Sequence, residues 1–278
     1  ITADQVSISG FDEIGNSSQI SSISPAANSG TITITVQSVN ITDLGLLQTV
    51  GNGGNITIQG AQNVNVTSVS AIQSVGGDTG PSGDIAISAD QVLISGQNEF
   101  SRSRIETVSG GQAETGKITL NVRELVVTDG GRINTENTVS GSRLGGIHII
   151  ATESLTVSDE GKIRMENLAG PAGPIAIDAP TITLDQGIIQ TESLSGNAGS
   201  VTLHADNLTL AGGFINTKVT QDVPGRGGDV TVNVTDTVSL SGQFNGNVVG
   251  DNPRPAGIYA DTAGTLQGGD ISVTAGNL

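Results

Sequence analysis

A short segment, a glycine followed by alternating aliphatic residues, recurs along the whole chain. Each copy reads glycine, any residue, Ile or Val, any residue, and then Ile, Leu or Val. The copies begin at Gly30, Gly54, Gly83, Gly116, Gly145, Gly173, Gly199, Gly228 and Gly269. Most of them lie about 29 residues apart, with variable connections. Self-similarity at such a period is typical of stacked units rather than of one compact core.

Each unit contains three short runs in which aliphatic and polar residues alternate. The glycine-led run is followed by a second, such as Leu155–Val157, and by a third, such as Ile189–Thr191. Alternating β-branched residues predict strands. The predicted fold is therefore an all-β, right-handed parallel β-helix, a solenoid, because parallel crossovers are overwhelmingly right-handed. At about 29 residues per coil, the 278 residues predict about 9–10 coils with three short strands each.

An antiparallel hairpin sandwich is the competing fold. Two-residue turns such as Asp129–Gly130 occur, but they do not explain why every third strand has the same character. In the solenoid, Ile56, Ile85 and Ile118 are expected in one interior column, and the glycines mark corners that need positive φ or no side chain. A row of inward hydroxyl side chains is expected to serve packing: Ser22, Thr49, Ser74, Thr107, Thr135, Thr191 and Thr217.

The repeat covers the whole chain, so residues 1–278 are interpreted as a single β-helix segment. Ile1 falls inside a first strand and Leu278 opens a second, so both ends are expected to cut a repeat in mid-coil. The longest unit contains a predicted loop insertion over residues 241–268, which includes Phe244 and Tyr259. Because recognition tends to lie on loops held by a rigid scaffold, this insertion is a candidate partner-binding region.

Composition narrows the partners that such a rod can have. The net charge is −16, from 11 basic and 27 acidic residues, which disfavours nucleic acid because phosphates require Lys and Arg. No apolar run reaches the roughly 18 residues of a transmembrane helix, so no membrane-spanning segment is expected. Cysteine is absent, which excludes disulfides and thiolate metal sites.

The repeat motifs resemble those of a known class of exoproteins. Glycine-led runs such as Gly54–Ile58 are followed by a Val-x-Ile-Ser-Gly motif, as in Val92–Gly96, and by Gly-x-Ile-x-Thr, as in Gly131–Thr135. This order is similar to the repeat region of filamentous haemagglutinin-like, two-partner-secretion exoproteins of the cyanobacterial type. The Asn-Pro-Asn motifs of that family's secretion domain are missing, and Asn252–Gly257 is only a faint echo of them.

The resemblance implies a right-handed β-helix that is exported through an outer-membrane transporter and acts in adhesion. On this basis we expect a non-enzymatic fibre or stalk segment of an adhesin, secreted or held at the bacterial cell surface. A glycan or protein receptor on a host or another cell is the implied partner. The absence of cysteine suits a chain that crosses a pore unfolded.

The third run carries most of the charge. Residues two apart on a strand face the same way, so a row of polar residues is expected to point outward along this run. The candidate surface-binding residues are Arg104, Glu106, Arg132, Asn134, Glu136, Lys162, Arg164, Glu166, Gln190 and Glu192, with Phe244 and Tyr259 of the insertion.

Three of these carboxylates, Glu136, Glu166 and Glu192, are expected to stack on successive coils about 5 Å apart. Their repulsion would raise a pKa, as a general acid requires, so a polysaccharide lyase or glycoside hydrolase using them with Arg164 is the alternative function. Only 2% of the residues are aromatic, which weighs against a sugar cleft. The same oxygens suit an adventitious Ca²⁺ ion, although no cofactor is expected. The plainest interpretation is a solvated face whose charge is offset by Arg132, Lys162, Arg164 and Lys218.

One loop contains a rare aromatic residue. Leu93 and Val126 are apolar residues on an otherwise polar outward row of the second run, and residues 97–103 form an extra loop in the same coil. We expect Phe100 in this loop to fold over Leu93, Val126 or both, since burying a Phe contributes about 1.5–3 kcal/mol. The alternative is an interface to which Phe100 belongs.

Overall fold

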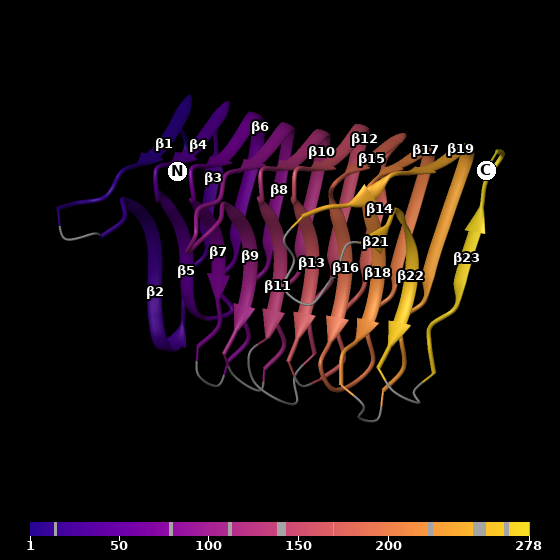
Figure 1. The fold of residues 1–278 in the computed structure, drawn as a ribbon. Helices are drawn as coiled ribbons and strands as arrows, with labels where there is room; N and C mark the ends of the chain where they lie inside the picture. Colours follow the sequence, from indigo (N-terminus) through magenta and orange to yellow (C-terminus); the bar gives the residue numbers. More distant parts are fainter. Residues whose placement is uncertain are drawn as a thin grey trace.

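The computed structural model describes residues 1–277, except 14–15, 78–79, 111–112, 138–142, 169, 222–224, 247–253 and 264–266. Leu278, expected to open a second strand, lies outside the described residues. The described part of the chain consists of strands, turns and loops without a helix, and so contains no helix able to cross a membrane. The strands stack into a rod with the two termini at opposite ends (Figure 1).

Twelve parallel strands form the larger sheet, and nearly all of them follow one another in chain order along the rod. They are β1 (Gln5–Ser9), β3 (Ile32–Thr35), β4 (Ser38–Thr42), β6 (Ile56–Thr67), β8 (Ile85–Ser95), β10 (Ile118–Thr128), β12 (Ile147–Ser158), β14 (Ile175–Asp178), β15 (Thr181–Asp185), β17 (Val201–Ala211), β19 (Val230–Ser241) and β23 (Ile271–Thr274).

Nine parallel strands form the second sheet, which we call the nine-stranded sheet. They are β2 (Gln19–Asn28), β5 (Leu46–Asn52), β7 (Ala71–Val75), β9 (Arg104–Ser109), β11 (Arg132–Asn137), β13 (Lys162–Asn167), β16 (Ile188–Ser193), β18 (Phe214–Val219) and β22 (Gly257–Thr262). From β2 to β18, each strand of this sheet follows a strand of the larger sheet, so the chain alternates between the two sheets as it advances along the rod.

The fold is thus the predicted all-β parallel β-solenoid, but its turns differ from the expectation in two ways. About seven regular turns, from β4–β5 to β17–β18, replace the predicted 9–10, because the incomplete or interrupted turns at the two ends also contain repeat motifs. In most turns the first and second runs form one bent strand of the larger sheet, so a turn has two strands rather than three. A register shift marks the bend in β6, between Ile58 and Ala61.

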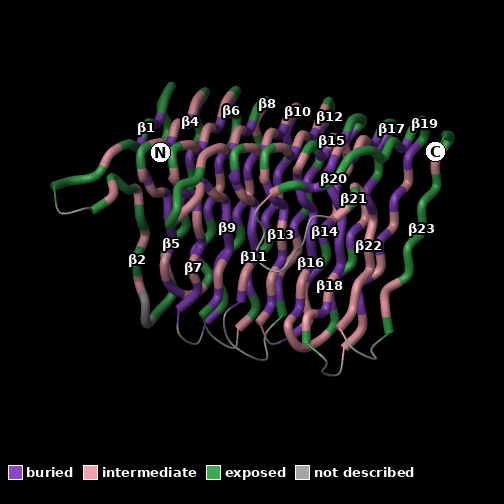
Figure 2. Tube along the Cα trace, viewed as in Figure 1, coloured by how far each residue is buried: buried purple, intermediate pink, exposed green. Residues whose placement is uncertain are grey.

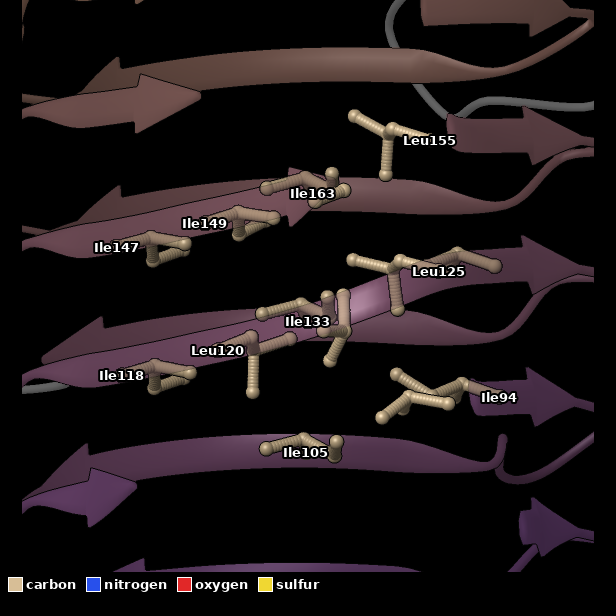
Figure 3. Close-up of a cluster of buried hydrophobic side chains, with 14 of the residues drawn as sticks. Ile94, Ile105, Ile118, Leu120, Leu125, Ile133, Ile147, Ile149, Leu155 and Ile163 are labelled. Atoms are coloured by element: carbon tan, nitrogen blue, oxygen red, sulfur yellow. The ribbon is translucent and has the colours of Figure 1, made fainter. Parts of the chain in front are cut away.

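The core is a column of aliphatic side chains between the two sheets. Figure 2 shows that buried residues recur in successive strands along the rod. Ile56, Ile85 and Ile118 pair in register on adjacent strands and are fully buried, as predicted. Figure 3 shows the equivalent side chains of neighbouring turns lying one above another, for example Ile118 and Ile147. Alternation fixes this register, because a slip of one residue would expose the whole aliphatic set.

Glycine at the start of the first run is required by close approach between turns. A Cβ atom on Gly116 would lie 2.1 Å from the carbonyl oxygen of Gly83, and one on Gly145 would lie 2.3 Å from that of Gly116. Neither Gly116 nor Gly145 has a positive φ. Of the two reasons expected for corner glycines, the absence of a side chain is therefore the one that applies here.

The residues predicted as a long loop are partly structured. β20 (Gln243–Phe244) and β21 (Arg254–Pro255) form a small antiparallel pair, and Figure 1 shows this segment crossing in front of the nine-stranded sheet. β22, which also lies in the range 241–268, pairs with β18 and belongs to that sheet. We use the name insertion for the segment between β19 and β22. Of the motif Asn252–Gly257 noted in the sequence, the first two residues lie outside the described part.

Candidate functional site

The outer face of the nine-stranded sheet gathers the polar residues expected there. Asn134 on β11 pairs with Glu106 on β9 and with Arg164 on β13. Two residues before it, Arg132 pairs with Arg104 and Lys162. Both rows follow directly from the alternation of the third run. All ten polar residues singled out from the sequence therefore share one face over four adjacent strands, β9, β11, β13 and β16.

The carboxylates stack as expected, and arginine neutralises part of the row. Glu136 pairs with Glu166, and Glu166 pairs with Glu192 on the following strand. The Nη2 atom of Arg164 lies 2.8 Å from Glu166 Oε1 and 2.9 Å from Glu192 Oε2. The amide of Gln190 also donates to Glu192 Oε2 at 3.0 Å. The guanidinium of Arg164 therefore offsets the negative charge of both carboxylates.

This face is more enclosed than a solvated sheet surface. Lys162, Asn134 and Gln190 are 6%, 5% and 3% exposed, respectively. Long side chains on strands about 4.8 Å apart cover one another's stems, which accounts for part of this burial. Charges on the face consequently interact more strongly than charges in water.

Burial shifts the ionisation of two residues on this face. It raises the pKa of the Glu166 carboxyl, opposed by Arg164 and reinforced by the neighbouring carboxylates of Glu136 and Glu192. It also lowers the pKa of the Arg132 guanidinium to about 10, reinforced by the positive charges of Arg102 and Arg164. Repulsion between the stacked carboxylates is thus a smaller cause than the loss of water.

The charges do not make a metal site in the described residues. No group of three or more His, Asp or Glu side chains there has an arrangement that could hold a metal ion. The stacked carboxylates are instead paired with Arg164, which occupies the position that a cation would take between Glu166 and Glu192.

The two aromatic residues singled out in residues 241–268, Phe244 and Tyr259, pack in one cluster with Phe214 of the nine-stranded sheet. Phe244 is fully buried and meets the ring of Phe214 edge-on, with centroids 5.2 Å apart. The guanidinium carbon of Arg254 lies 3.6 Å from the Tyr259 ring centroid and 5.1 Å from that of Phe214. Together with Ile188, these side chains fasten the insertion to the nine-stranded sheet. Arg254 was not identified from the sequence.

The prediction that Phe100 covers Leu93 or Val126 is wrong. Phe100 is 91% exposed, because the loop turns outward over the other sheet. Its backbone N–H and that of Ser101 donate to Asn98 Oδ1 at 2.9 Å and 2.8 Å, forming a local turn. This turn holds the backbone at Phe100, while the ring extends into solvent.

Phe100 instead lies at a groove on the candidate face. The groove has a volume of about 200 Å³, and Ser101 and Arg102 of the same loop contribute to it. The remaining lining residues are Arg104, Glu106, Arg132, Asn134 and Glu136, all from the sequence-derived set. Arg102 was missed because it precedes the strand. The signal for it was its position two residues before Arg104.

A second groove follows the bend of the larger sheet. It has a volume of about 830 Å³ and a floor of small residues that includes Ala151, Ala179 and Ala205. His204 lies in its wall with Nδ1 3.4 Å from Asn233 Nδ2, so this exposed histidine has a polar neighbour. This groove is open to solvent along its length. Its lining contains no Lys or Arg, whereas the groove on the nine-stranded sheet contains three Arg residues.

Comparison with protein-family models, with curated protein sequences and with solved structures found no match for this chain.

Proposed function

We propose that this chain is a non-enzymatic fibre or stalk segment of a secreted bacterial adhesin that acts at the cell surface. The resemblance of the repeat to haemagglutinin-like exoproteins supports this proposal, as does the solenoid fold. Under this proposal an outer-membrane transporter exports the chain, and the outer face of the nine-stranded sheet contacts a glycan or protein receptor.

The main observation in favour is that one face of an acidic rod gathers five cations beside four carboxylates, Glu106, Glu136, Glu166 and Glu192. The chain has 11 Lys and Arg residues against 27 acidic ones. Five of those cations lie on or beside β9, β11 and β13: Arg102, Arg104, Arg132, Lys162 and Arg164. Parallel strands hold them on a stiff support, so little conformational freedom is lost when a partner binds. Repetition of the support along a fibre would add avidity.

Adhesion can be tested with beads coated with the chain and passed over surfaces that carry saccharides or cell-envelope material. We expect retention under flow, and a loss of retention when Arg104, Arg132 and Arg164 are changed together to Gln. The matched control changes Lys117, Arg123 and Arg226 to Gln, which removes the same charge elsewhere. Equal behaviour of the two triple variants, with both folded by circular dichroism, would reject this face as the contact surface.

A polysaccharide lyase or glycoside hydrolase is the second candidate, favoured by the raised pKa of Glu166 in a stack with Glu136 and Glu192. A general acid needs such a shift to hold its proton near neutral pH. Against an enzymatic role, Arg164 bridges Glu166 and Glu192, so both carboxylates are already in ion pairs. Release of reducing or unsaturated ends from a polysaccharide panel, abolished by Glu166→Gln, would replace the adhesin proposal with this one.

A further inference from the structure

The groove beside Phe100 contains a cation, Arg132, that makes no ion pair with the described residues, although the carboxylates of Glu166 and Glu136 act on its charge from farther away. Neighbouring Arg104 is paired: its Nε lies 2.5 Å from Glu106 Oε1, and its Nη2 donates to Gln73 at 3.1 Å. In contrast, the described residues offer the Arg132 guanidinium no hydrogen bond and no ion pair, and its buried Nε has no partner. A buried charge without a partner is costly, so this arrangement favours an anion from outside.

Hydrogen-bond acceptors line the same groove. Asn134 is 5% exposed, and its Oδ1 is buried without a partner, while its Nδ2 donates to Glu136 Oε2 at 3.1 Å. A buried acceptor without a donor is rare in proteins, so a ligand hydroxyl group that reached it would complete its hydrogen bonding. Glu106 and Glu136 add carboxylate acceptors on either side.

Phe100 lies at the rim of the groove, on a loop that is hydrogen-bonded to β9. Arg104 Nη1 donates to Ser101 Oγ at 3.2 Å and to the Arg102 carbonyl at 3.3 Å, so the loop is tied to β9. Arg102 Nη1 donates to Gln97 Oε1 at 2.8 Å and closes the loop at its base. The loop is thereby held beside the groove, and its exposed Phe100 ring is available to the apolar C–H face of a ligand.

We propose that this groove binds an acidic saccharide, with the sugar carboxylate on Arg132, hydroxyl groups on Asn134 and Glu136, and the ring face against Phe100. The inference deepens the adhesin proposal and rests on it, since it names the ligand class of the contact face. In this arrangement the saccharide contacts Arg132 and Asn134, the two groove residues with an unpartnered buried atom. The strands keep their positions.

The mixture of charges decides between ligand classes. A polyanion such as an acidic peptide or a nucleic acid would place negative charge beside Glu106 and Glu136, where repulsion opposes binding. A neutral sugar would leave Arg132 unpaired. A ring with one carboxylate and several hydroxyl groups matches one unpaired cation surrounded by acceptors. The volume of about 200 Å³ suits one such ring at a time.

The test is calorimetric titration of the folded chain with tetragalacturonate at low salt, with neutral galactotetraose as the comparison probe. We expect the acidic probe to bind at least tenfold more tightly. Arg132→Gln should weaken its binding at least tenfold, and the charge-matched control Arg123→Gln should not change it. Phe100→Ser should weaken binding, whereas Phe11→Ser, which removes a ring 60% exposed in another loop, should have no effect.

Each outcome separates this inference from the adhesin proposal. Equal binding of both probes, or equal effects of the Arg132 and Arg123 variants, would overturn the acidic-saccharide site while bead retention could still hold. Binding of a polyglutamate peptide, but of neither saccharide, would assign the groove to acidic protein and also overturn it. Loss of bead retention with intact, Arg132-dependent binding of tetragalacturonate would support the site and reject adhesion.

Discussion

Thr217 shows how a single hydroxyl group is used inside the solenoid. It is fully buried, and its Oγ1 donates to the Gly228 carbonyl oxygen at 2.5 Å. Thr49 and Thr191 make the same bond to Gly54 and Gly199 at 2.5 Å. The predicted hydroxyl row therefore satisfies the carbonyl groups of the glycine corners, which cannot be reached by water.

Replacing Thr217 by Val keeps the shape and removes the hydrogen bond. We expect this change to lower the free energy of unfolding by about 1–3 kcal/mol, because a buried acceptor loses its donor. Chemical denaturation measures the difference. Thr209→Val, at a half-buried position on the outer row of β17, is the control and should change stability by no more than about 0.5 kcal/mol. Equal losses at the two sites would contradict the role of the hydroxyl row.

Glu166 makes stability depend on pH in the direction opposite to a typical paired carboxylate. Its pKa in the folded chain is raised above the ordinary value of 4.5, chiefly by burial. The folded state therefore binds the proton more tightly than the unfolded state. The resulting contribution to stability is fully present below pH 4.5 and is lost as the pH rises through the folded pKa.

Glu166→Gln, which resembles the protonated carboxyl, should therefore raise Tm relative to the parent chain at pH 7. This advantage should shrink as the pH falls to about 4, where the parent carboxyl is itself protonated. Thermal unfolding followed by circular dichroism across this range measures it, with Glu153→Gln as a control because that side chain is 54% exposed. An advantage that grows towards acidic pH would show that loss of the Arg164 contact outweighs burial.

Individual side chains show where sequence reasoning succeeds and where it does not. Ile133 pairs with Ile105 and Ile163, as the alternation predicts, because the strand period leaves only one register that buries all three. Phe100 was misplaced because its position depends on hydrogen bonds to Asn98, and hydrophobicity alone does not encode these. The isolation of Arg132 was also missed, since it depends on which neighbouring carboxylates already have partners.

At the level of elements, the insertion is held by an aromatic cluster separate from the solenoid core. Ile188, Phe214 and Phe244 form this cluster, with Tyr259 packed against it. Gln186 adds two polar contacts, donating to the Gln243 carbonyl at 2.9 Å and accepting from the Asn245 N–H at 2.7 Å. The insertion is thus attached from outside, on side chains that point away from the core.

Phe244→Ala should release the insertion without unfolding the rod. Truncating a buried Phe costs about 3–5 kcal/mol, and this loss falls on contacts that the solenoid core does not share. Hydrogen exchange should show faster exchange in β20, β21 and β22, with unchanged protection in β10 and β12. Phe100→Ala, which removes an exposed ring, should leave all of these rates unchanged. Faster exchange throughout the rod would show that the insertion supports every turn.

The sequence predicts elements well only where they repeat. The three runs were found correctly, but the fusion of the first two into strands such as β6 was not, because Gly60 between them resembles a turn residue. The insertion has no second copy for comparison, so the packing of Phe244 on Phe214 could not be inferred. β22 was overlooked although Ile258 and Ala260 keep the alternation of a third run, because the preceding spacing is irregular.

For the whole molecule, the arrangement of contacts is nearly one-dimensional. The dominant packing pairs, such as β6 with β8 and β10 with β12, join strands of successive turns. Turns farther apart affect each other only through those between them. Stability in such a solenoid is approximately a sum of terms for each turn and for each interface between neighbours.

This arrangement predicts a pattern of coupling between core substitutions. Ile→Val costs about 0.5–1.5 kcal/mol in a packed core. The pair Ile118 and Ile147, which lie in register on adjacent strands, should show a double-mutant coupling of 0.5 kcal/mol or more, to order of magnitude. Ile56 and Ile175 occupy the same column but four turns apart, and their effects should add within about 0.5 kcal/mol. Denaturant unfolding of the single and double variants measures both. Coupling between the remote pair as strong as that between the neighbours would mean that strain passes along the whole column, so the rod would respond as one body rather than turn by turn.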